Sequence, residues 1–557
     1  MKILKKDNIK LYIPLLVALV MIIGILLGNL FAGLRVKSII SHEISRHTTN
    51  TRGGFRSSQG LQIAPKNDKI SSALYYVLNE YVDTVSVNKI NESVIPAILE
   101  NLDPHSVYIP AKEFQKYNEP LAGNFSGIGV QFNMTDDSVA IISTISNGPS
   151  EIVGVLPGDR IIAVDDSIVA GVNMPSDDIV GMLKGRKGTS VRVKVKRRRI
   201  DVPIDFDIIR DDIPLYSVDV HYMITDEIGY IKISQFAQTT IKEFMIAAEE
   251  LKAAGMKKTI IDLRNNGGGI MEAAIAIADQ FLPDGRLIVY TEGRSRPRRN
   301  EYASSKGILK DDVLVILQDE FSASASEILA GAIQDNDRGK IIGRRSFGKG
   351  LVQEQMKFSD GSALRLTVAK YYTPTGRSIQ KPYTENHEEY YRDLNNRLQN
   401  GEFENADSIH FNDSLKFVTP AGKIVYGGGG IMPDIFVPID TLGISDYYNR
   451  VRSLGLIYRF AFRYTDLHRE KMTGLSTAEE ISGYLDDQNI KADFIEYASS
   501  QGVKPNYSQF RESEEIILTQ VKAYIARNMI DNLGFYPIIS SIDNTLAIAI
   551  EELSAKD

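Results

Sequence analysis

Ser324 and Lys349 are the two side chains of this sequence whose types and surroundings best suit nucleophilic chemistry. Ser324 follows an apolar run at 313–317, typical of a buried strand, and precedes an alanine-rich run that predicts a helix. A serine at such a turn lies beside free N–H groups and the positive end of the helix dipole, which favour negative charge. Lys349 lies between two glycines, 25 positions later (349 − 324). Burial can lower the pKa of a lysine toward neutrality, so that it serves as the general base of a Ser–Lys pair.

The same serine also has a purely structural interpretation. Ser324-x-x-Glu327 is a capping-box pattern, in which two side chains bind each other's backbone N–H groups at the start of a helix. Ser322 and Ser326 are assigned to the turn and the cap rather than to attack. The stretch by itself leaves cap and nucleophile open for Ser324, and the presence of Lys349 favours the nucleophile.

A glycine-rich loop lies upstream of the serine turn. It joins an apolar run at 259–263, which predicts a buried strand, to a predicted helix at 270–282. Such a loop can hold phosphate, but this one lacks the Lys-Ser/Thr of a P-loop and the GxGxxG spacing of a dinucleotide site. It can instead offer backbone N–H groups to an oxyanion. Asp262 and Arg264 are expected to brace this loop rather than to react.

Two motifs carry a family resemblance. They resemble the carboxyl-terminal processing proteases, or tail-specific proteases, which are Ser/Lys endopeptidases of the S41 type: Ser324-Ala325-Ser326-Glu327 and Phe347-Gly348-Lys349-Gly350-Leu351-Val352-Gln353. The resemblance covers roughly residues 70–440. It implies a crotonase-like α/β core in which Ser324 is the nucleophile, Lys349 the general base and Gln353 the residue that orients the lysine.

The resemblance also assigns roles around the reacting groups. It favours an oxyanion hole formed by the N–H groups of Gly269 and Ala325, with Gly268 as the alternative neighbour. The Asp-Pro-His-Ser turn at 103–106 resembles a short motif of the family. His105 in this turn is expected to be structural, because Lys349 already fills the role of base.

Residues 120–206 resemble a PDZ domain with a carboxylate-binding loop at 126–130. Consecutive backbone N–H groups of such a loop capture a terminal carboxylate, and the strand edge that follows pairs with the peptide. The expected substrate-binding residues are Gly127, Ile128, Gly129 and Val130, of which Ile128 and Val130 would help to line the side-chain pocket. The alternative is that these glycines serve only a tight turn.

Residues 11–33 are almost wholly apolar and long enough to cross a bilayer as one helix. Four lysines precede this run, so positive-inside logic leaves residues 1–10 in the cytoplasm. A cleaved signal peptide is the rival interpretation, but 30–32 match a cleavage site poorly. We expect a single-pass anchor in a bacterial inner membrane, a linker at 34–68, and a catalytic part on the periplasmic or extracytoplasmic side.

Length and composition bound the remaining possibilities. The 557 residues predict several domains: a helical segment at 69–119, the PDZ domain at 120–206, a protease core at 207–440 and a helical domain at 441–557. The fold class is therefore α/β, or α+β when all domains are counted. Cysteine is absent, and the seven histidines show no metal-ligand spacing, so neither a metal nor another cofactor is expected. The net charge of −7 gives no reason to expect nucleic acid.

The sequence therefore predicts a membrane-anchored serine endopeptidase that recognises substrate C-termini. Its partners would be protein or peptide substrates, with a homo-oligomer or an adaptor protein as open options for the helical domain at 441–557. One alternative is a non-catalytic PDZ scaffold on an inactive core. Another is an enzyme acting on acyl thioesters through the glycine loop, but this does not explain the PDZ-like segment or the Ser–Lys pair.

Overall fold

The computed structural model describes residues 68–135, 137–383, 387–410 and 412–555. The chain divides into two compact units, residues up to Val85 and residues from Ser86 onward. In the first unit the structure describes helix α2 (Lys69–Glu80), which begins where Asp68 accepts a hydrogen bond from the Ser71 N–H group (2.8 Å). All elements below belong to the second unit.

The predicted membrane anchor at 11–33 lies outside the described residues. Within the part of the chain that the structure describes, no single helix is long and apolar enough to cross a membrane. The two helical segments Asn532–Ile542 and Asn544–Ser554 together meet the length and composition requirement, but they are bent by 82° where they join.

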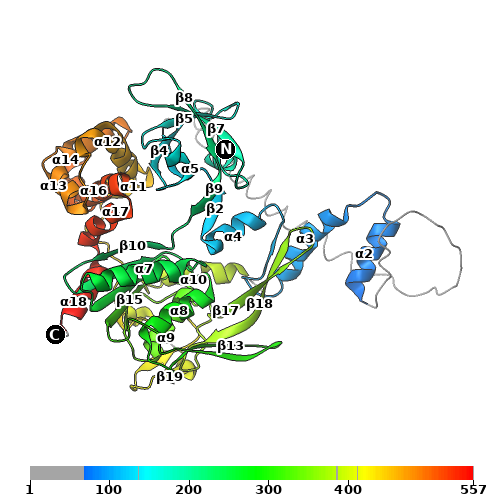
Figure 1. Ribbon diagram of the computed structural model, residues 1–557. Coiled ribbons are helices and arrows are strands. Elements are labelled where there is room, and N and C mark those ends of the chain that lie inside the picture. The colour runs from blue at the N-terminus through cyan, green and yellow to red at the C-terminus, as the bar shows by residue number, and fades with distance from the viewer. Residues whose placement is uncertain (1–67, 136, 384–386, 411, 556–557) are drawn as a thin grey trace, which may run out of the picture. The chain divides into compact units, whose positions relative to one another are not determined.

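The predicted protease core is built on a sheet of six strands in the order β10-β11-β12-β15-β16-β21. Two of these strands, β10 and β15, are labelled in Figure 1. All neighbours are parallel except β10, which runs antiparallel to β11. The strands are β10 (Val218–Met223), β11 (Ile228–Ile233), β12 (Lys258–Asp262), β15 (Val313–Gln318), β16 (Lys340–Gly343) and β21 (Ile435–Phe436). The central strands are buried nearly throughout, as continuous apolar runs in a parallel sheet require.

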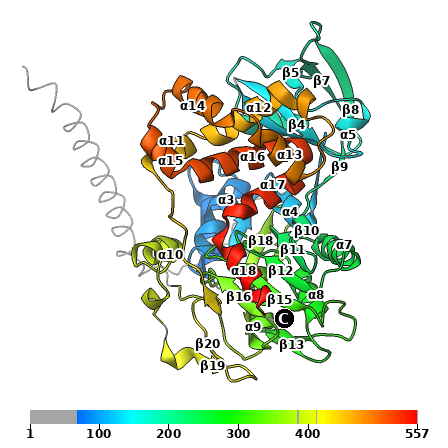
Figure 2. The same ribbon diagram turned by 90° about the vertical axis from the view of Figure 1, so that its left-hand side faces the viewer.

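Helices cover both faces of this sheet. Alternate strand residues such as Ile231, Ile261 and Ile316 pack against α7 (Thr240–Ala253), α8 (Met271–Phe281) and α9 (Ala325–Asp335). The opposite set, which includes Ile260 and Val315, packs against α18 (Asn544–Ser554). Figure 2 shows α18 on one side of the core strands and α7 and α8 on the other. The core is therefore a three-layer α/β structure.

A second sheet lies beside the first, in the order β1-β18-β13-β14 with β17 paired to β18. Its strands are β1 (Val107–Ile109), β13 (Leu287–Gly293), β14 (Arg296–Tyr302), β17 (Leu351–Lys357) and β18 (Ala363–Tyr372). The predicted hairpin between 352–358 and 363–372 is confirmed as β17 and β18. The segment 69–119 was expected to consist of helices broken by a turn at 103–106. It contains α2, α3 (Val87–Leu99) and most of α4 (Phe114–Ala122), but the residues after the turn form strand β1. Three residues are too short to show a period, and β1 forms only through its distant partner β18.

The PDZ domain interrupts the chain between α4 and the core sheet. It is a six-stranded antiparallel sheet with two short helices, entered and left through the paired strands β2 (Asn124–Gly127) and β9 (Asp211–Pro214). Its elements are β3 (Val130–Thr135), β4 (Ser138–Thr144), α5 (Pro149–Ile152), β5 (Arg160–Val164), β6 (Ser167–Ile168), α6 (Ser176–Leu183), β7 (Ser190–Lys196) and β8 (Ile204–Ile209). β3 lies at the edge of this sheet.

Between β18 and β21 the chain forms α10 (His387–Gln399), two short 3-10 turns and the hairpin β19 (Lys416–Val418) and β20 (Ile424–Tyr426). After β21 a bundle of six helices encloses its own apolar core. These are α11 (Asp446–Ser453), α12 (Leu456–Met472), α13 (Ala478–Asp486), α14 (Ile490–Ser500), α15 (Tyr507–Glu512) and α16 (Glu514–Ile530).

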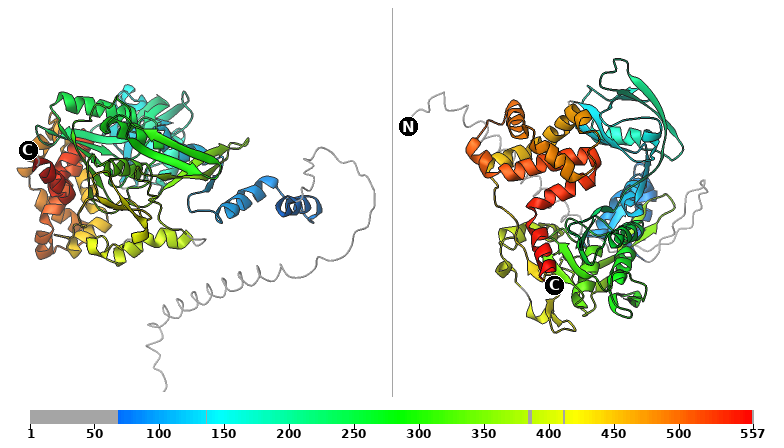
Figure 3. Two further views of the ribbon diagram at one scale, coloured as in Figure 1. Left: turned by 90° about the horizontal axis from the view of Figure 1, so that it is seen from below. Right: turned by 60° about the vertical axis from the view of Figure 1, so that its left-hand side comes forward.

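The segment predicted as one helical domain, 441–557, is helical over its described length but divides into two parts. The bundle ends at α16, and the chain then returns to the core sheet through α17 (Asn532–Ile539), the short helix η3 (Ser540–Ile542) and α18. Figure 3 shows this last segment, in red, leading from the bundle to the core strands. The predicted fold class, an α/β core with a PDZ domain and a C-terminal helical region, agrees with the structure.

Candidate active site

The two predicted motifs meet at one edge of the core sheet. β12 leads into the glycine loop and β15 into the serine turn, and because these strands are parallel neighbours their carboxyl ends lie side by side. The contact is close: a methyl group built on Gly268 would lie 2.7 Å from Ser324 Cβ and 3.0 Å from Ala325 N. Neighbouring parallel strands thus bring the predicted nucleophile and the predicted oxyanion loop together.

Ser324 immediately precedes α9 in an uncommon backbone conformation, φ 56° and ψ −112°. A non-glycine residue in this region is strained and persists only where the surroundings fix it. The side chain is half-buried. Ser322 and Ser326, by contrast, are each 1% exposed, and their hydroxyls donate to the carbonyls of Leu263 and Asn266 (both 2.9 Å). Their assignment to the turn and the helix start agrees with this geometry.

Glu327 connects the serine turn to the lysine loop. Its fully buried carboxylate accepts hydrogen bonds from the N–H groups of Ser324 (2.8 Å), Lys349 (2.9 Å) and Gly348 (2.7 Å), and from the Ser346 hydroxyl (2.5 Å). Burial raises its pKa to about 7, against the effect of these donors. The glutamate half of the predicted capping box is therefore present, and the same contact holds the predicted nucleophile and base together.

Tyr371, from β18, joins the same two residues from the other side. Its hydroxyl lies 3.0 Å from the carbonyl oxygen of Ser324 and 2.6 Å from that of Lys349. The main chains of Ser324 and Lys349 are thus fixed relative to one another by two buried side chains, Glu327 and Tyr371.

The Lys349 side chain is suited to the role of a base. Burial lowers its pKa, as does the nearby Arg365, while Glu327 and Asp103 oppose the shift. Among the residues that the structure describes, its ammonium group forms no hydrogen bond or ion pair. A desolvated lysine without a fixed partner is more readily neutral than a surface lysine.

Gln353 lies on β17, close to the lysine loop, but no hydrogen bond joins it to Lys349 in the described part of the chain. Its side-chain amide donates to the Thr367 hydroxyl (3.3 Å), which donates to the buried carboxylate of Asp103 (3.0 Å). The role of Gln353 in orienting the lysine stays a prediction. His105, in the same turn as Asp103, contacts the Tyr390 hydroxyl at 2.8 Å, and burial lowers its pKa to about 4, which fits its expected structural role.

The N–H groups assigned to the oxyanion hole differ in whether they are already used. The Gly268 N–H donates to the Asn266 side chain (2.9 Å), whereas the N–H groups of Gly269 and Ala325 find no acceptor among the described residues. Gly269 has φ 140°, and a methyl group on it would lie 2.0 Å from the Phe236 carbonyl oxygen, so only glycine fits. The geometry favours Gly269 and Ala325 over Gly268.

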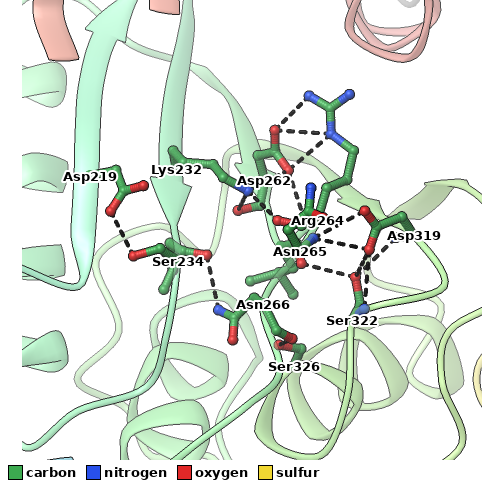
Figure 4. Close-up of polar contacts among 12 residues, drawn as sticks. Asp219, Lys232, Ser234, Asp262, Arg264, Asn265, Asn266, Asp319, Ser322 and Ser326 are labelled. Atoms are coloured by element: carbon green, nitrogen blue, oxygen red, sulfur yellow. Dashed lines mark hydrogen bonds and ion pairs between the residues drawn. The ribbon is translucent and has the colours of Figure 1, made fainter. Parts of the chain in front are cut away.

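Charged side chains surround the start of the oxyanion loop, near Asn265 (Figure 4). Asp262 is buried between Arg264 (2.6 Å) and Lys232 (3.2 Å), and these two cations hold its pKa below its usual range although burial alone would raise it. The Asp319 carboxylate accepts from the N–H groups of Asn265 (3.0 Å) and Ser322 (3.1 Å), which ties the glycine loop to the serine turn. The expectation that Asp262 and Arg264 brace the loop agrees with these contacts.

The predicted carboxylate-binding loop of the PDZ domain lies between β2 and the edge strand β3. The N–H groups of Ile128 and Gly129 have no acceptor among the described residues, whereas their carbonyls accept from Ser150 (3.0 Å) and Ile145 (2.9 Å). Ile128 is 3% exposed and belongs to the apolar core of the domain, against which Val130 also packs. Gly127 pairs with Asp211 in the short β2–β9 ladder.

Sequence reasoning missed four participants in this site. Glu327 was seen only as a cap, although its place in the motif was visible; Asp103 lies in a turn that was noted for its resemblance. Tyr371 and Asp543 lie in no local sequence motif that would have pointed to the site. Asp543 forms an ion pair with Arg264 (2.7 Å). Both reach the site only through tertiary packing.

Comparison with known proteins supports the same assignment. Residues 227–390 match Peptidase family S41, residues 126–208 match the PDZ domain family, and residues 447–531 match a family of unknown function. The chain is 36% identical over 309 residues to a carboxy-terminal-processing protease of Bartonella bacilliformis, covering 55% of this chain and 70% of that protein. It is 34% identical over 317 residues to the carboxy-terminal processing protease CtpA of Bacillus subtilis, covering 57% and 67%.

Among solved structures, the photosystem II D1 C-terminal processing protease is similar over 67% of this chain and 88% of its own, with a TM-score of 0.36 and 23% identity. The match to Peptidase family S41 includes both the serine and the lysine motifs and four of the six strands of the core sheet, β11, β12, β15 and β16. With its PDZ domain, its α/β core and its level of identity to these relatives, this chain belongs to the carboxy-terminal processing proteases of peptidase family S41.

Proposed function

We propose that this protease cleaves peptide bonds by a Ser–Lys mechanism, with Ser324 as nucleophile and Lys349 as general base. The observation that carries the proposal is the shared support of these two residues. Glu327 and Tyr371 each bind the main chain of both, while the Lys349 ammonium group is left buried and without a partner among the described residues.

The reaction follows from this arrangement. Neutral Lys349 takes the proton of the Ser324 hydroxyl as its oxygen attacks the scissile carbonyl carbon, and the N–H groups of Gly269 and Ala325 stabilise the oxyanion. The intermediate collapses to an acyl-enzyme when the protonated lysine gives its proton to the leaving amine. A water molecule, deprotonated by Lys349, then attacks the ester and releases the acid.

The PDZ domain selects the substrate by its C-terminus. The N–H groups of Ile128 and Gly129, which have no acceptor among the described residues, donate to the terminal carboxylate, and the edge of β3 pairs with the residues before it. Val130, which is only partly buried, contributes to the pocket for the terminal side chain, whereas the Ile128 side chain is buried in the core of the domain. A substrate with an apolar C-terminal residue therefore binds best.

The N-terminal segment anchors the protease to a bacterial inner membrane. The apolar run at 11–33 is long enough to span a bilayer, and the four lysines before it place the N-terminus in the cytoplasm. The PDZ domain and the protease core then lie on the periplasmic or extracytoplasmic side, where they meet exported proteins.

Cleavage of an unfolded reporter protein by the full chain in mild detergent tests the mechanism. Ser324→Ala and Lys349→Ala should each reduce kcat by about 10³-fold or more, the usual result of losing one member of a catalytic pair. Lys370→Ala, which removes an exposed lysine of β18, serves as a matched control and should retain activity. Cleavage by Lys349→Ala at the wild-type rate would contradict the mechanism. Binding of C-terminal peptides without any turnover by the wild type would favour a PDZ scaffold instead.

A further inference from the structure

The last helix of the chain is part of the protease core. Leu546, Ala549 and Leu553 on α18 are buried, at 1%, 0% and 0% exposure, against the face of the core sheet that α7, α8 and α9 leave uncovered. The Lys340 side chain on β16 pairs with Glu552 (2.5 Å), and the Lys258 side chain on β12 donates to the Leu553 carbonyl (3.1 Å). The helical bundle is therefore an insertion in the chain between two segments of the core, β21 and α17.

Asp543, just before α18, reaches the base of the oxyanion loop. Its two carboxylate oxygens accept from the two terminal nitrogens of Arg264 (2.8 and 2.7 Å), a bidentate ion pair. One of these oxygens also accepts from the Leu546 N–H group (3.1 Å), which fixes the carboxylate to the start of α18. The same Arg264 guanidinium donates to Asp262 on its other side (2.6 Å).

Arg264 is the first residue of the loop that ends in Gly269. In Figure 4 its guanidinium extends away from the loop, while its main chain lies between Lys232 and Asn265. Its N–H group donates to Asp262 (2.9 Å) and its carbonyl accepts from Lys232 (2.5 Å). The next residue, Asn265, has φ 59°, and its N–H group donates to Asp319. A shift of Arg264 would therefore be passed directly to the turn that presents the Gly269 N–H group.

We propose that Asp543 is a positioning residue for the oxyanion hole: by clamping Arg264, the C-terminal segment of the chain sets the position of the Gly269 N–H group relative to Ser324. The inference rests on the proposed function, because it gives that loop its catalytic meaning. It assigns a role to a part of the chain that follows the matched protease and helical families, which end at residues 390 and 531.

The electrostatics of the clamp agree with this role. Arg264 is half-buried, and this partial burial opposes its charge, yet the carboxylates of Asp262 and Asp543 hold its pKa above its usual range. Asp262 must also neutralise Lys232. Without Asp543 the two cations, Arg264 and Lys232, share the single carboxylate of Asp262, which favours movement of the guanidinium toward water.

Steady-state kinetics of the full chain test the proposal with Asp543→Asn, which keeps the size of the side chain but removes its charge. We expect kcat to fall about tenfold, less than the ~10²–10³-fold cost of losing an oxyanion donor outright. KM and the affinity of a C-terminal peptide for the PDZ domain should change less than about twofold, since neither involves the oxyanion. The inhibition constant of a peptide aldehyde, which forms a tetrahedral adduct with the serine, should rise in step with the loss of kcat.

Further variants separate positioning from simple docking of the helix. Arg264→Lys should lose a similar factor in kcat, and the double variant should lose little more, because both changes break one interaction. Asp543→Glu should recover part of the rate. Glu552→Gln removes the other ion pair of α18 and should leave kcat unchanged. Amide hydrogen exchange at 264–270 should be faster in Asp543→Asn and unchanged in Glu552→Gln.

The outcomes are distinct. An Asp543→Asn enzyme that is folded, with wild-type kcat and unchanged exchange at 264–270, overturns the inference and leaves the proposed function intact. An equal loss of kcat in Glu552→Gln also overturns it, since docking of α18 in general would then be the cause. A wild-type chain without turnover overturns the proposed function, and the inference falls with it.

Discussion

Two loops of this protein present free backbone N–H groups to a negatively charged oxygen, and they are supported in different ways. The PDZ loop offers Ile128 and Gly129 and rests on an apolar core, with its carbonyls bound by Ser150 and Ile145. The oxyanion site offers Gly269 and Ala325 and rests on the half-buried Arg264 and on buried charged residues: Asp262, Lys232, Asp319 and Glu327. One site is proposed to bind a stable carboxylate and the other to stabilise a transient charge.

The difference reflects how precisely each site has to be placed. A bound peptide can adjust to a loop that moves slightly, because its carboxylate and strand pairing are formed together. A catalytic donor must already lie where the charge develops, since reorganisation during the reaction costs rate. Directional hydrogen bonds between buried charges fix a backbone more firmly than apolar packing, which is non-directional. We therefore expect changes in the two loops to affect different kinetic parameters.

Of the variants considered, Glu327→Gln should produce the largest difference between its effect on catalysis and its effect on peptide binding. The amide keeps the shape of the carboxylate but turns an NH2 group toward a pair of donors, either Ser324 and Lys349 or Gly348 and Ser346. We expect kcat/KM for a peptide substrate to fall by about 10²–10³-fold, as for loss of an oxyanion donor. Peptide binding by the PDZ domain, measured by fluorescence anisotropy, should not change.

Glu320→Gln is the matched control for this variant. Glu320 is a buried glutamate of the same turn, but it pairs with Arg344 (2.7 Å) rather than with the serine or lysine. It should retain most of the activity. If the two variants lose activity equally, the support of Ser324 and Lys349 by Glu327 is not what matters.

A pH–rate profile should also distinguish the two sites. In the proposed mechanism Lys349 acts in its neutral form, so kcat/KM should fall by about tenfold per pH unit below the pKa of the lysine and level off above it. Burial and Arg365 lower this pKa, against Glu327 and Asp103, so the plateau begins at lower pH than an exposed lysine would allow. Burial raises the pKa of Glu327 to about 7, so this carboxyl also takes up a proton on the acid side of the profile. Its protonation should make kcat/KM fall more steeply below that pH.

Peptide binding should stay constant over the same range. The PDZ loop donates backbone N–H groups, which do not titrate, and a terminal carboxylate stays ionised above about pH 4. Activity that remains flat into the acid range would show that Lys349 is not the base. A parallel loss of peptide binding would show instead that the domain itself unfolds.

Gly129→Ala should give the smallest effect, and it should weaken peptide binding rather than catalysis. Gly129 has φ 74°, and a methyl group there would lie 3.0 Å from Ile213 Cδ1, so alanine strains the loop. A left-handed alanine costs about 1–2 kcal/mol, and we expect roughly five- to thirtyfold weaker binding of a C-terminal peptide, with kcat unchanged. Gly171→Ala has a similar φ of 76° but nothing within 4 Å, and should leave peptide affinity unaltered. A fall in kcat for Gly129→Ala would contradict the separation of the two loops.

Much of this arrangement could be predicted from local patterns. Ser324, Lys349 and the glycine loop were each visible as short motifs beside apolar runs, and neighbouring parallel strands were enough to bring the serine and the loop together. The sequence favoured Gly269 over Gly268 only through the family resemblance, and the structure adds a physical reason for this choice. It depends on the side chain of Asn266, which occupies the Gly268 N–H group. β1 was missed because a three-residue strand has no period of its own and forms only against β18.

The sequence by itself determined the family, the α/β class, the PDZ domain and the residues that carry the proposed chemistry, because these are encoded in runs of ten or twenty neighbouring residues. Tertiary structure alone decided which groups support them. Tyr371 and Asp543 lie 47 and 279 positions from the residues they hold, Ser324 and Arg264. Contacts between residues so far apart in the sequence depend on how sheets and helices pack. No local pattern of polar and apolar residues predicts which polar side chain will lie at a given buried site.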